Sequence, residues 1–389
     1  MSKLTQLDNT HTYHCADGRQ ILIGASETHP YVAHETVKTI LRSDEEPFIP
    51  TRTGRLRRTK VGEMMKRLPM CALIWRPDRQ FEPFLELFLD VYKSHPIRSC
   101  AGMAPFDICP ITGKHVHQES LDFVLTLRRT ATDTKVYKRQ ADWKSKYVKA
   151  SESFMRLEAA CFEARARCMV VFCSFYLRKQ ILTSEEIDAH LIEQSKLALT
   201  NALTFEEGCE LQADMMSDGL VSFDELQHYR VAFFGKKKTA PELFEHMIGY
   251  AWCIEYAPYT GYHLHAVFFF DGAEEQKHAH KGQLLGERWK MVTNGLGWAH
   301  NSNLSWKENH VRCGIGNIEH YQTAKRNNLR QLLRYLAKTE QMVPMLPKAM
   351  TNIFGKMQPP QRDPKKGGAP RVKVAQLVSI TTTSQGAKW

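Results

Sequence analysis

Two runs of strand-forming residues, joined by a short polar turn, decide the fold of this chain: Trp252-Cys253-Ile254-Glu255-Tyr256 and Gly261-Tyr262-His263-Leu264-His265-Ala266-Val267-Phe268-Phe269-Phe270. The turn contains Pro258 and Gly261, so the two runs predict a β-hairpin. Because successive side chains of a strand point to opposite faces, His263 and His265 share one face. A turn centred on residues 258–260 also places Glu255 opposite His263. One carboxylate and two imidazoles therefore meet on the same face.

This cluster predicts a divalent metal site with Glu255, His263 and His265 as ligands and the remaining positions open to a substrate oxygen. Imidazole suits manganese, zinc or nickel, whereas carboxylate and water suit magnesium or manganese, so the ligands alone leave the metal open. Two histidines on a half-solvated strand are also ordinary polar residues. The metal assignment needs support from elsewhere in the chain.

A helix predicted further along the chain gives that support. Apolar residues recur at helical spacing within residues 328–339. Tyr335 and Lys338 are three residues apart and therefore share a face of this helix. A phenol and an amine can thus enter one site.

Taken in order, these residues resemble the HUH endonucleases, which are rolling-circle replication initiators. More narrowly, residues 155–345 are similar to the filamentous-phage and prophage replication proteins grouped with YagK and YfjJ. The segments that carry the likeness are Ile254-Glu255-Tyr256, Gly261-Tyr262-His263-Leu264-His265, Gly286-Glu287-Arg288-Trp289, Gly314-Ile315-Gly316-Asn317-Ile318 and Tyr335-Leu336-Ala337-Lys338. Where the family tends to have an acidic residue late in its first strand, this chain has Cys173-Ser174-Phe175.

The resemblance implies an α+β fold, in which an antiparallel sheet with flanking helices forms an RRM-like palm. Apolar residues at helical spacing before this segment predict a mainly helical N-terminal region. It also implies a metal-dependent single-strand DNA endonuclease (nickase) and strand transferase. Tyr335 would attack the DNA to form a 5′-phosphotyrosine link and free a 3′-hydroxyl primer, and strands would later be rejoined. Lys338 would favour the phenolate or neutralise phosphate charge. Mg²⁺ or Mn²⁺ would be held by Glu255, His263 and His265.

Two alternatives remain open from the sequence. Single-tyrosine transposases and plasmid relaxases use the same motif set and differ in what happens to the DNA ends. A noncatalytic DNA-binding regulator could keep the sheet without the chemistry, although it would have no need for Glu255, His263, His265, Tyr335 and Lys338 together.

The composition suits a protein with a polyanionic partner. The 389 residues are 43% hydrophobic, which is enough for a sizeable core and indicates about two domains. The formal net charge is +11 and the isoelectric point is near 9.1. No stretch approaches the length of about 18 apolar residues that a membrane helix needs, and the first residues lack a signal-peptide core, so we expect a cytoplasmic protein without a membrane partner. Ten cysteines without a CxxC pair indicate reduced thiols.

Three regions are predicted along the chain. Residues 1–150 form a basic N-terminal accessory region that is a candidate for DNA contact, with basic residues clustered in 52–67. Residues 151–345 form the endonuclease domain, and residues 346–389 form a basic tail that we expect to be disordered. Patterns within these regions predict helices over 81–93, 137–167 and 274–292, strands over 169–176 and 311–318, and a glycine and asparagine loop over 294–303.

Two further motifs bear on cofactors and partners. Cys100, Cys109, His115 and His117 offer two thiols and two imidazoles at spacings irregular for a zinc finger, so zinc binding by these four is left open. The run Gly235-Lys236-Lys237-Lys238-Thr239 lacks the first glycine of a phosphate-binding loop, and no other stretch supplies one. Strand opening would then need a separate motor. The expected partners are single-stranded or hairpin origin DNA, a host helicase and a polymerase.

Overall fold

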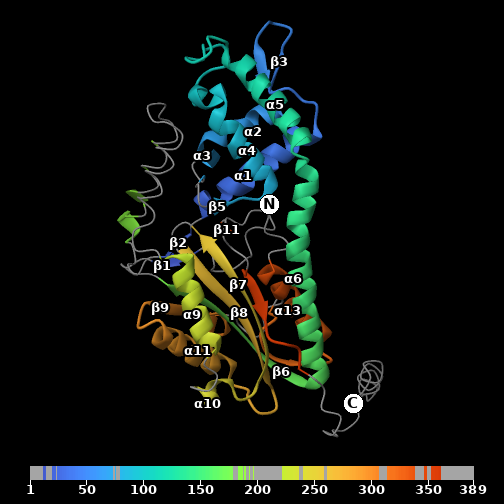
Figure 1. Ribbon diagram of the computed structural model, residues 1–389, viewed down its shortest axis with the longest axis vertical. Helices are drawn as coiled ribbons and strands as arrows, with labels where there is room; N and C mark the ends of the chain where they lie inside the picture. Colours follow the sequence, from blue (N-terminus) through green and yellow to red (C-terminus); the bar gives the residue numbers. More distant parts are fainter. Residues whose placement is uncertain are drawn as a thin grey trace, which may run out of the picture.

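The two long strands of the predicted hairpin lie inside an antiparallel sheet, in the lower half of the view in Figure 1. The computed structural model describes residues 12–14, 20–22, 24–72, 75, 79–177, 183–186, 188–189, 192, 196, 221–235, 240–257, 261–305, 313–337, 346–347 and 352–360. Within this part of the chain the strand order is β10-β6-β8-β7-β12, and β9 also pairs with β6. The strands are β6 (Arg167–Leu177), β7 (Met247–Ala257), β8 (Gly261–Asp271), β9 (Gly297–Asn301), β10 (Gly316–Glu319) and β12 (Phe354–Lys356).

The predicted hairpin and its register are confirmed. Strands β7 and β8 pair antiparallel, and Glu255 is the direct partner of His263. The turn residues 258–260 lie outside the described residues. On the other side of β8, β6 pairs along nearly its whole length, with Ser174 opposite His265 and Tyr176 opposite His263. This continuous apolar strand is buried on both faces, as the run over 169–176 predicts.

Each face of the sheet is covered by its own set of helices. Helices α9 (Phe223–Gly235), α10 (Pro241–Phe244) and α11 (His278–Val292) pack on one face, where Trp289 is fully buried. Helices α6 (Val136–Ala164) and α13 (Thr323–Leu336) pack on the other. The odd-numbered residues of β8 point to this second face, so His263 and His265 lie on the side of α6 and α13.

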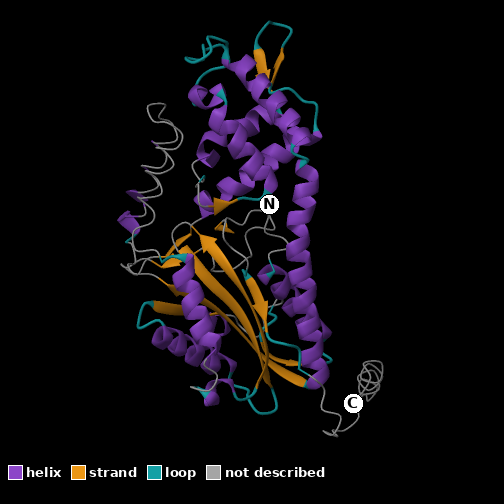
Figure 2. Cartoon of the chain, in the orientation of Figure 1, coloured by secondary structure: helices purple, strands orange, loops and turns teal. Residues whose placement is uncertain are grey.

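The N-terminal part of the chain is mainly helical, as predicted, and forms the upper half of the view in Figure 2. Its helices are α1 (Gly24–Arg42), α2 (Lys60–Met65), α3 (Leu68–Ala72), α4 (Pro83–Ser94), the 3₁₀ helix η2 (Pro96–Cys100) and α5 (Val116–Asp133). Three two-stranded ribbons accompany them: β1 (Thr12–His14) with β2 (Gln20–Leu22), β3 (Phe48–Pro50) with β4 (Leu56–Arg58), and β5 (Arg79–Gln80) with β11 (Leu346–Pro347).

Local sequence fixes where α4 begins. Pro83 occupies the first turn, where its missing N–H is not needed, and the Glu82 carboxylate accepts hydrogen bonds from the backbone N–H groups of Phe84 and Leu85. Glu82 also contacts Nδ1 of the buried His34 on α1 at 2.8 Å. This cap therefore joins two helices of the N-terminal core.

Several sequence predictions need correction. A loop was predicted over 294–303, but residues 297–301 form strand β9. Their backbone pairs with the end of β6, and this pairing outweighs their glycine and asparagine content. The tail predicted from residue 346 begins too early, since β12 pairs with β7 and extends the sheet. Residues 361–389 lie outside the described part. Of the strand predicted over 311–318, only the last part is a strand, β10, which begins at Gly316. The helix predicted to begin at residue 274 begins at His278.

Helix α6 crosses the predicted domain boundary at residue 150. It is continuous for 29 residues and contacts α4 and α5 in the helical part as well as β6, β7 and α13 in the sheet part. The basic stretch 52–67 includes strand β4, which pairs with β3 at the top of Figure 1, at the end of the molecule far from the sheet. None of the described helices is long and apolar enough to cross a membrane.

A buried carboxylate fastens α13 to α6. Glu158 on α6 is fully buried, and its two oxygens accept hydrogen bonds from Nε of Arg326 at 2.8 Å and from Nε of Arg330 at 3.1 Å. The Arg326 guanidinium also lies over the Phe162 ring, 4.4 Å from its centroid. Glu158 thus helps to hold the helix that carries Tyr335 against α6.

Replacing Glu158 by alanine is expected to lower the free energy of unfolding by about 2 kcal/mol, because two charged hydrogen bonds are lost while the partly exposed guanidinium groups can be solvated. Urea unfolding followed by circular dichroism measures the change. Glu152→Ala is the matched control on the same helix, because its ion pair with Arg156 is solvent-exposed. A Glu158 variant as stable as the Glu152 variant would contradict this prediction.

Candidate metal centre

Three side chains from two paired strands converge on one face of the sheet. The nearest oxygen of Glu255 on β7 lies 3.0 Å from Nε2 of His265 and 3.9 Å from Nε2 of His263, both on β8. Two ligands about 2.1 Å from a shared cation, at angles between a right angle and a tetrahedral one, would be about 3.0–3.4 Å apart. The 3.0 Å separation lies in that range, and the 3.9 Å separation exceeds it by about 0.5 Å. The two imidazoles are almost completely buried, and Glu255 is partly exposed.

The opposite ring nitrogen of each histidine is held by a second contact. Nδ1 of His263 lies 3.1 Å from the carbonyl oxygen of Gly261, and a carbonyl can only accept, so Nδ1 carries the proton. In the neutral ring, Nε2 of His263 then presents a lone pair to the cluster. Nδ1 of His265 lies 2.7 Å from the Ser174 hydroxyl oxygen, which can hold this ring in the same tautomer.

The environment of His265 favours a bound cation. Its Nε2 is buried and has no hydrogen bond of acceptable geometry, although the Glu255 oxygen is only 3.0 Å away. A lone pair and a carboxylate oxygen at that distance repel each other unless a positive charge lies between them. Two nitrogens and one oxygen in this arrangement fit a divalent metal ion.

A second group of possible ligands lies in the helical part of the molecule, but its hydrogen bonds do not suit a metal. His95 accepts the backbone N–H of Ile97 at Nδ1, so its Nε2 carries the proton in the neutral ring and faces Asp122 at 3.3 Å. Burial lowers the pKa of His95, and its hydrogen bond with Asp122 opposes this. The remaining member, Glu119, accepts the Thr112 hydroxyl. No imidazole lone pair faces the centre of this group.

The four residues considered for zinc are not brought together among the described residues. The thiols of Cys100 and Cys109 lie 3.8 and 3.9 Å from the same carbonyl oxygen, that of Pro96. His115 and His117 stack on each other, with ring centroids 5.5 Å apart, and their Nδ1 atoms face backbone carbonyls. The metal-capable groups of the described chain include none of these four.

Tyr335 lies on the helix that covers the metal-site face. Leu329, Leu332, Leu333 and Leu336 bury the inner side of α13 in the core between this helix, α6 and the sheet. Tyr335 itself is partly exposed. Its predicted neighbour Lys338 lies outside the described residues.

Sequence reasoning missed two neighbours of the metal site, because both are its neighbours only through strand pairing. Ser174 contacts His265 from the adjacent strand, 91 residues away in the chain. Tyr176 stacks on His263, with ring centroids 5.1 Å apart and planes 17° from parallel. The strand register alone would have found both residues, once β6 was placed beside β8.

Replacing Ser174 by alanine is expected to weaken Mn²⁺ binding about 10-fold, because His265 loses the partner that orients its ring. Calorimetric titration of Mn²⁺ measures this. Ser151→Ala removes a buried serine hydroxyl from α6 and serves as the matched control. Equal affinities in the two variants would show that the Ser174 hydroxyl does not support the ligand.

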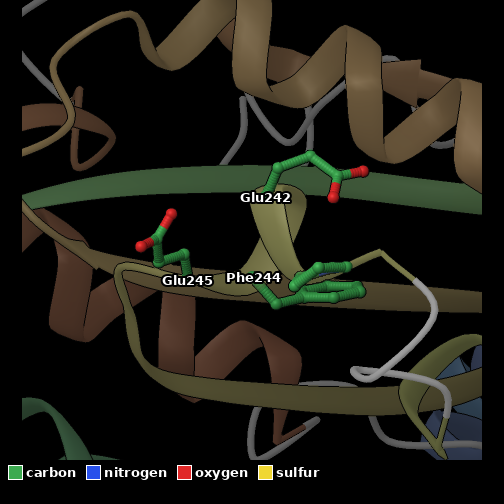
Figure 3. Close-up of a pocket in the computed structure, with 4 residues that line it drawn as sticks. Glu242, Phe244 and Glu245 are labelled. Carbon is green, nitrogen blue, oxygen red and sulfur yellow. The ribbon is translucent and has the colours of Figure 1, made fainter.

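An open depression of about 450 Å³ lies at the other end of β7, beside α10. Figure 3 shows its lining, in which Glu242 and Glu245 extend to different sides of a single helical turn next to Phe244. It lies at the start of β7, whereas Glu255 is near the end of that eleven-residue strand. This depression is therefore separate from the metal centre.

No protein-family profile, curated protein or solved structure matches the chain.

Proposed function

We propose that this chain is a rolling-circle DNA replication initiator of the HUH type, acting as a metal-dependent nickase and strand transferase on single-stranded origin DNA. The observation that carries the proposal is the pairing of Glu255 with His263, with His265 on the same face and both Nδ1 atoms turned away. A purely structural sheet face has no need of two buried imidazoles and a carboxylate with adjoining nitrogen and oxygen atoms. The α13 helix, packed on this face, carries Tyr335.

Each residue then has a defined role. The hydroxyl oxygen of Tyr335 attacks the scissile phosphorus, the P–O3′ bond breaks, and the phenolic proton is transferred in the net reaction to the leaving 3′-oxygen. The products are a 5′-phosphotyrosine and a free 3′-hydroxyl. A divalent cation bound by Glu255, His263 and His265, proposed as Mg²⁺ or Mn²⁺, would polarise the phosphate and neutralise charge on its nonbridging oxygens.

The covalent link makes the step reversible. A phosphotyrosine retains the free energy of the original phosphodiester, so a later 3′-hydroxyl can attack the same phosphorus and release Tyr335. Nicking and rejoining therefore use one set of residues. The two buried histidines, and a helix held to α6 through Glu158, would keep this set in place between the two steps.

The decisive experiment incubates the purified chain with single-stranded DNA from its own replicon, with Mn²⁺ and with a chelator, and separates the products under denaturing conditions. A protein–DNA adduct that forms only with the metal supports the proposal. DNA binding and metal binding without an adduct would favour a noncatalytic regulator. Sequencing the rejoined products separates circles, expected of replication, from DNA inserted at new sites, expected of a transposase.

A further inference from the structure

Strands β3 and β4 form a two-stranded ribbon at the end of the molecule far from the sheet, and Figure 2 shows its turn at the top of the view. Hydrogen bonds close this turn. The backbone N–H and the hydroxyl of Thr51 both donate to the carbonyl oxygen of Arg55, at 2.7 and 2.8 Å, and the N–H of Gly54 donates to the carbonyl oxygen of Thr51 at 3.0 Å. The φ of Gly54 is +78°, which glycine adopts without strain. The ribbon therefore ends in a turn of defined shape.

The base of the ribbon is held by helices at both of its strands. Thr59, which follows β4, donates its backbone N–H to the carbonyl oxygen of Pro47 at 3.1 Å, and its side chain caps α2. On the other side, the Arg128 guanidinium of α5 donates to the carbonyl oxygen of Ser43, shortly before β3, at 2.6 Å. Helices α2 and α5 thus fix the direction in which the ribbon projects.

The two faces of the ribbon differ in what they present. Phe48 on β3 is buried, and its direct partner Arg58 on β4 places its guanidinium 5.3 Å from the centre of the Phe48 ring, so this face is turned towards the protein. Side chains alternate between faces along a strand, so Arg57 points to the outward face, and Arg55, two residues earlier, shares it. Both of these arginines are exposed.

The outward face and the turn carry positive charge that the protein does not neutralise. Arg52, Arg55 and Arg57 are exposed, and the ion pairs in the described part of the chain include none of them. Carboxylates gather at the base of the ribbon, where residues 44–46 are acidic and exposed. A polyanion is therefore attracted to the outer end of the ribbon and repelled from its base.

The shape of the ribbon and its side chains favour duplex DNA as this polyanion. Sites for single strands combine basic residues with aromatic platforms, but Phe48, the one aromatic residue in the ribbon, is buried on the inward face. The major groove of B-DNA is about 12 Å wide and admits a two-stranded ribbon, whose strands are about 4.8 Å apart. The minor groove, at about 6 Å, and the deep, narrow major groove of duplex RNA are too narrow for it.

We propose that the β3–β4 ribbon binds duplex DNA by lying in its major groove, with Arg52, Arg55 and Arg57 contacting the bordering phosphates. The inference goes beyond the proposed function, because this binding requires no cutting. Helix α6 runs without a break from the N-terminal helices to the sheet. One molecule would therefore hold duplex DNA at one end and a single strand at the metal centre.

The test measures binding of the full chain to a fluorescent duplex of about 20 base pairs and to oligo-dT of the same length over a range of salt concentrations. Arg55→Gln/Arg57→Gln removes two phosphate contacts. We expect duplex binding to weaken by more than about 10-fold and its salt slope to fall by about 1.8, at about 0.9 for each contact. Binding of oligo-dT and metal-dependent adduct formation on single-stranded DNA should stay close to wild type.

The matched control is Lys277→Gln/Lys290→Gln, which removes the same charge from two exposed lysines at the two ends of α11. It should bind the duplex like wild type. A second duplex of the same sequence carries glucosylated hydroxymethyl groups on its cytosines, which fill the major groove and leave the phosphates unchanged. We expect the wild-type chain to bind this duplex more weakly than the plain one. Thermal unfolding checks that every variant is folded.

Three results would overturn the proposal: wild-type duplex binding by Arg55→Gln/Arg57→Gln, equal weakening on duplex and oligo-dT, or equal wild-type affinity for the plain and the glucosylated duplex. None of these results concerns the covalent adduct. Failure of the wild-type chain to form the adduct would instead overturn the proposed function and leave duplex binding by the ribbon intact.

Discussion

Replacing Tyr335 by phenylalanine is expected to abolish both nicking and the covalent adduct. The substitution removes only the oxygen that would form the bond to phosphorus, and no other group of a phenyl ring can replace it. Folding and single-strand binding should stay close to wild type, because Tyr335 is partly exposed and the leucines of α13 make the buried contacts. A denaturing gel shows the adduct, and peptide mapping identifies the residue that carries the DNA.

The structure separates Tyr335 from the other tyrosines of the sheet region. Tyr256 and Tyr262 pack with the core on the opposite face from the metal ligands. Tyr321 lies in the turn before α13, whereas Tyr335 is 12 residues beyond the first residue of that helix, about 18 Å along its axis. Tyr259 lies outside the described residues. Phenylalanine variants of these residues are therefore expected to keep full activity.

Tyr176 is the most demanding control, because it stacks directly on His263. Tyr176→Phe retains the stacked ring, so we expect it to form the adduct at nearly the wild-type rate. DNA attached to Tyr176 or Tyr321 in the wild-type adduct would assign the nucleophile to that residue and make the Tyr335 assignment wrong.

Replacing His263 or His265 by alanine is expected to weaken Mn²⁺ binding by more than about 100-fold and to remove metal-dependent cleavage. Each imidazole is buried and held at Nδ1, so water cannot readily take its place with the same orientation. Glu255→Ala should cause a smaller loss, because Glu255 is partly exposed and water can supply an oxygen ligand there.

Calorimetric titration of Mn²⁺ into each variant measures these losses. His280→Ala is the matched control, because His280 is an exposed histidine on α11. Unchanged Mn²⁺ affinity in both His263→Ala and His265→Ala would show that the two histidines are ordinary polar residues of a strand and bind no metal. Thermal unfolding without metal distinguishes loss of a ligand from loss of the fold.

The sequence predicted those parts of the molecule whose local pattern agrees with their final environment. Alternating side chains and a short turn were enough to pair Glu255 with His263, because strand period and turn position together set the register. The helix expected over 137–167 is α6, and the helix expected over 81–93 is α4. In both, apolar residues at helical spacing face a core.

The parts that were missed depend on partners far away in the chain. Residues 297–301 carry glycine and asparagine, and only their pairing with residues 173–177 of β6 makes them a strand. Strand β12 comes about 100 residues after β7 and pairs with it. Residues 173–175 lie where the resemblance led us to expect an acidic residue, and the structure places Ser174 of this segment against His265, a candidate metal ligand. Long-range pairing of this kind leaves no local periodicity to detect.

Helix α6 is also a rigid spacer between the N-terminal helices and the sheet. Its 29 residues span about 43 Å without a break, so anything held by the N-terminal helices sits at a fixed height and angle relative to the sheet. One extra residue in the middle of α6 would lengthen the helix by about 1.5 Å and rotate one end by about 100° relative to the other. Only changes of about 7, 11 or 18 residues would nearly restore the original phase. Insertions or deletions in α6 would therefore keep the relative orientation of the N-terminal helices and the sheet only at a few lengths.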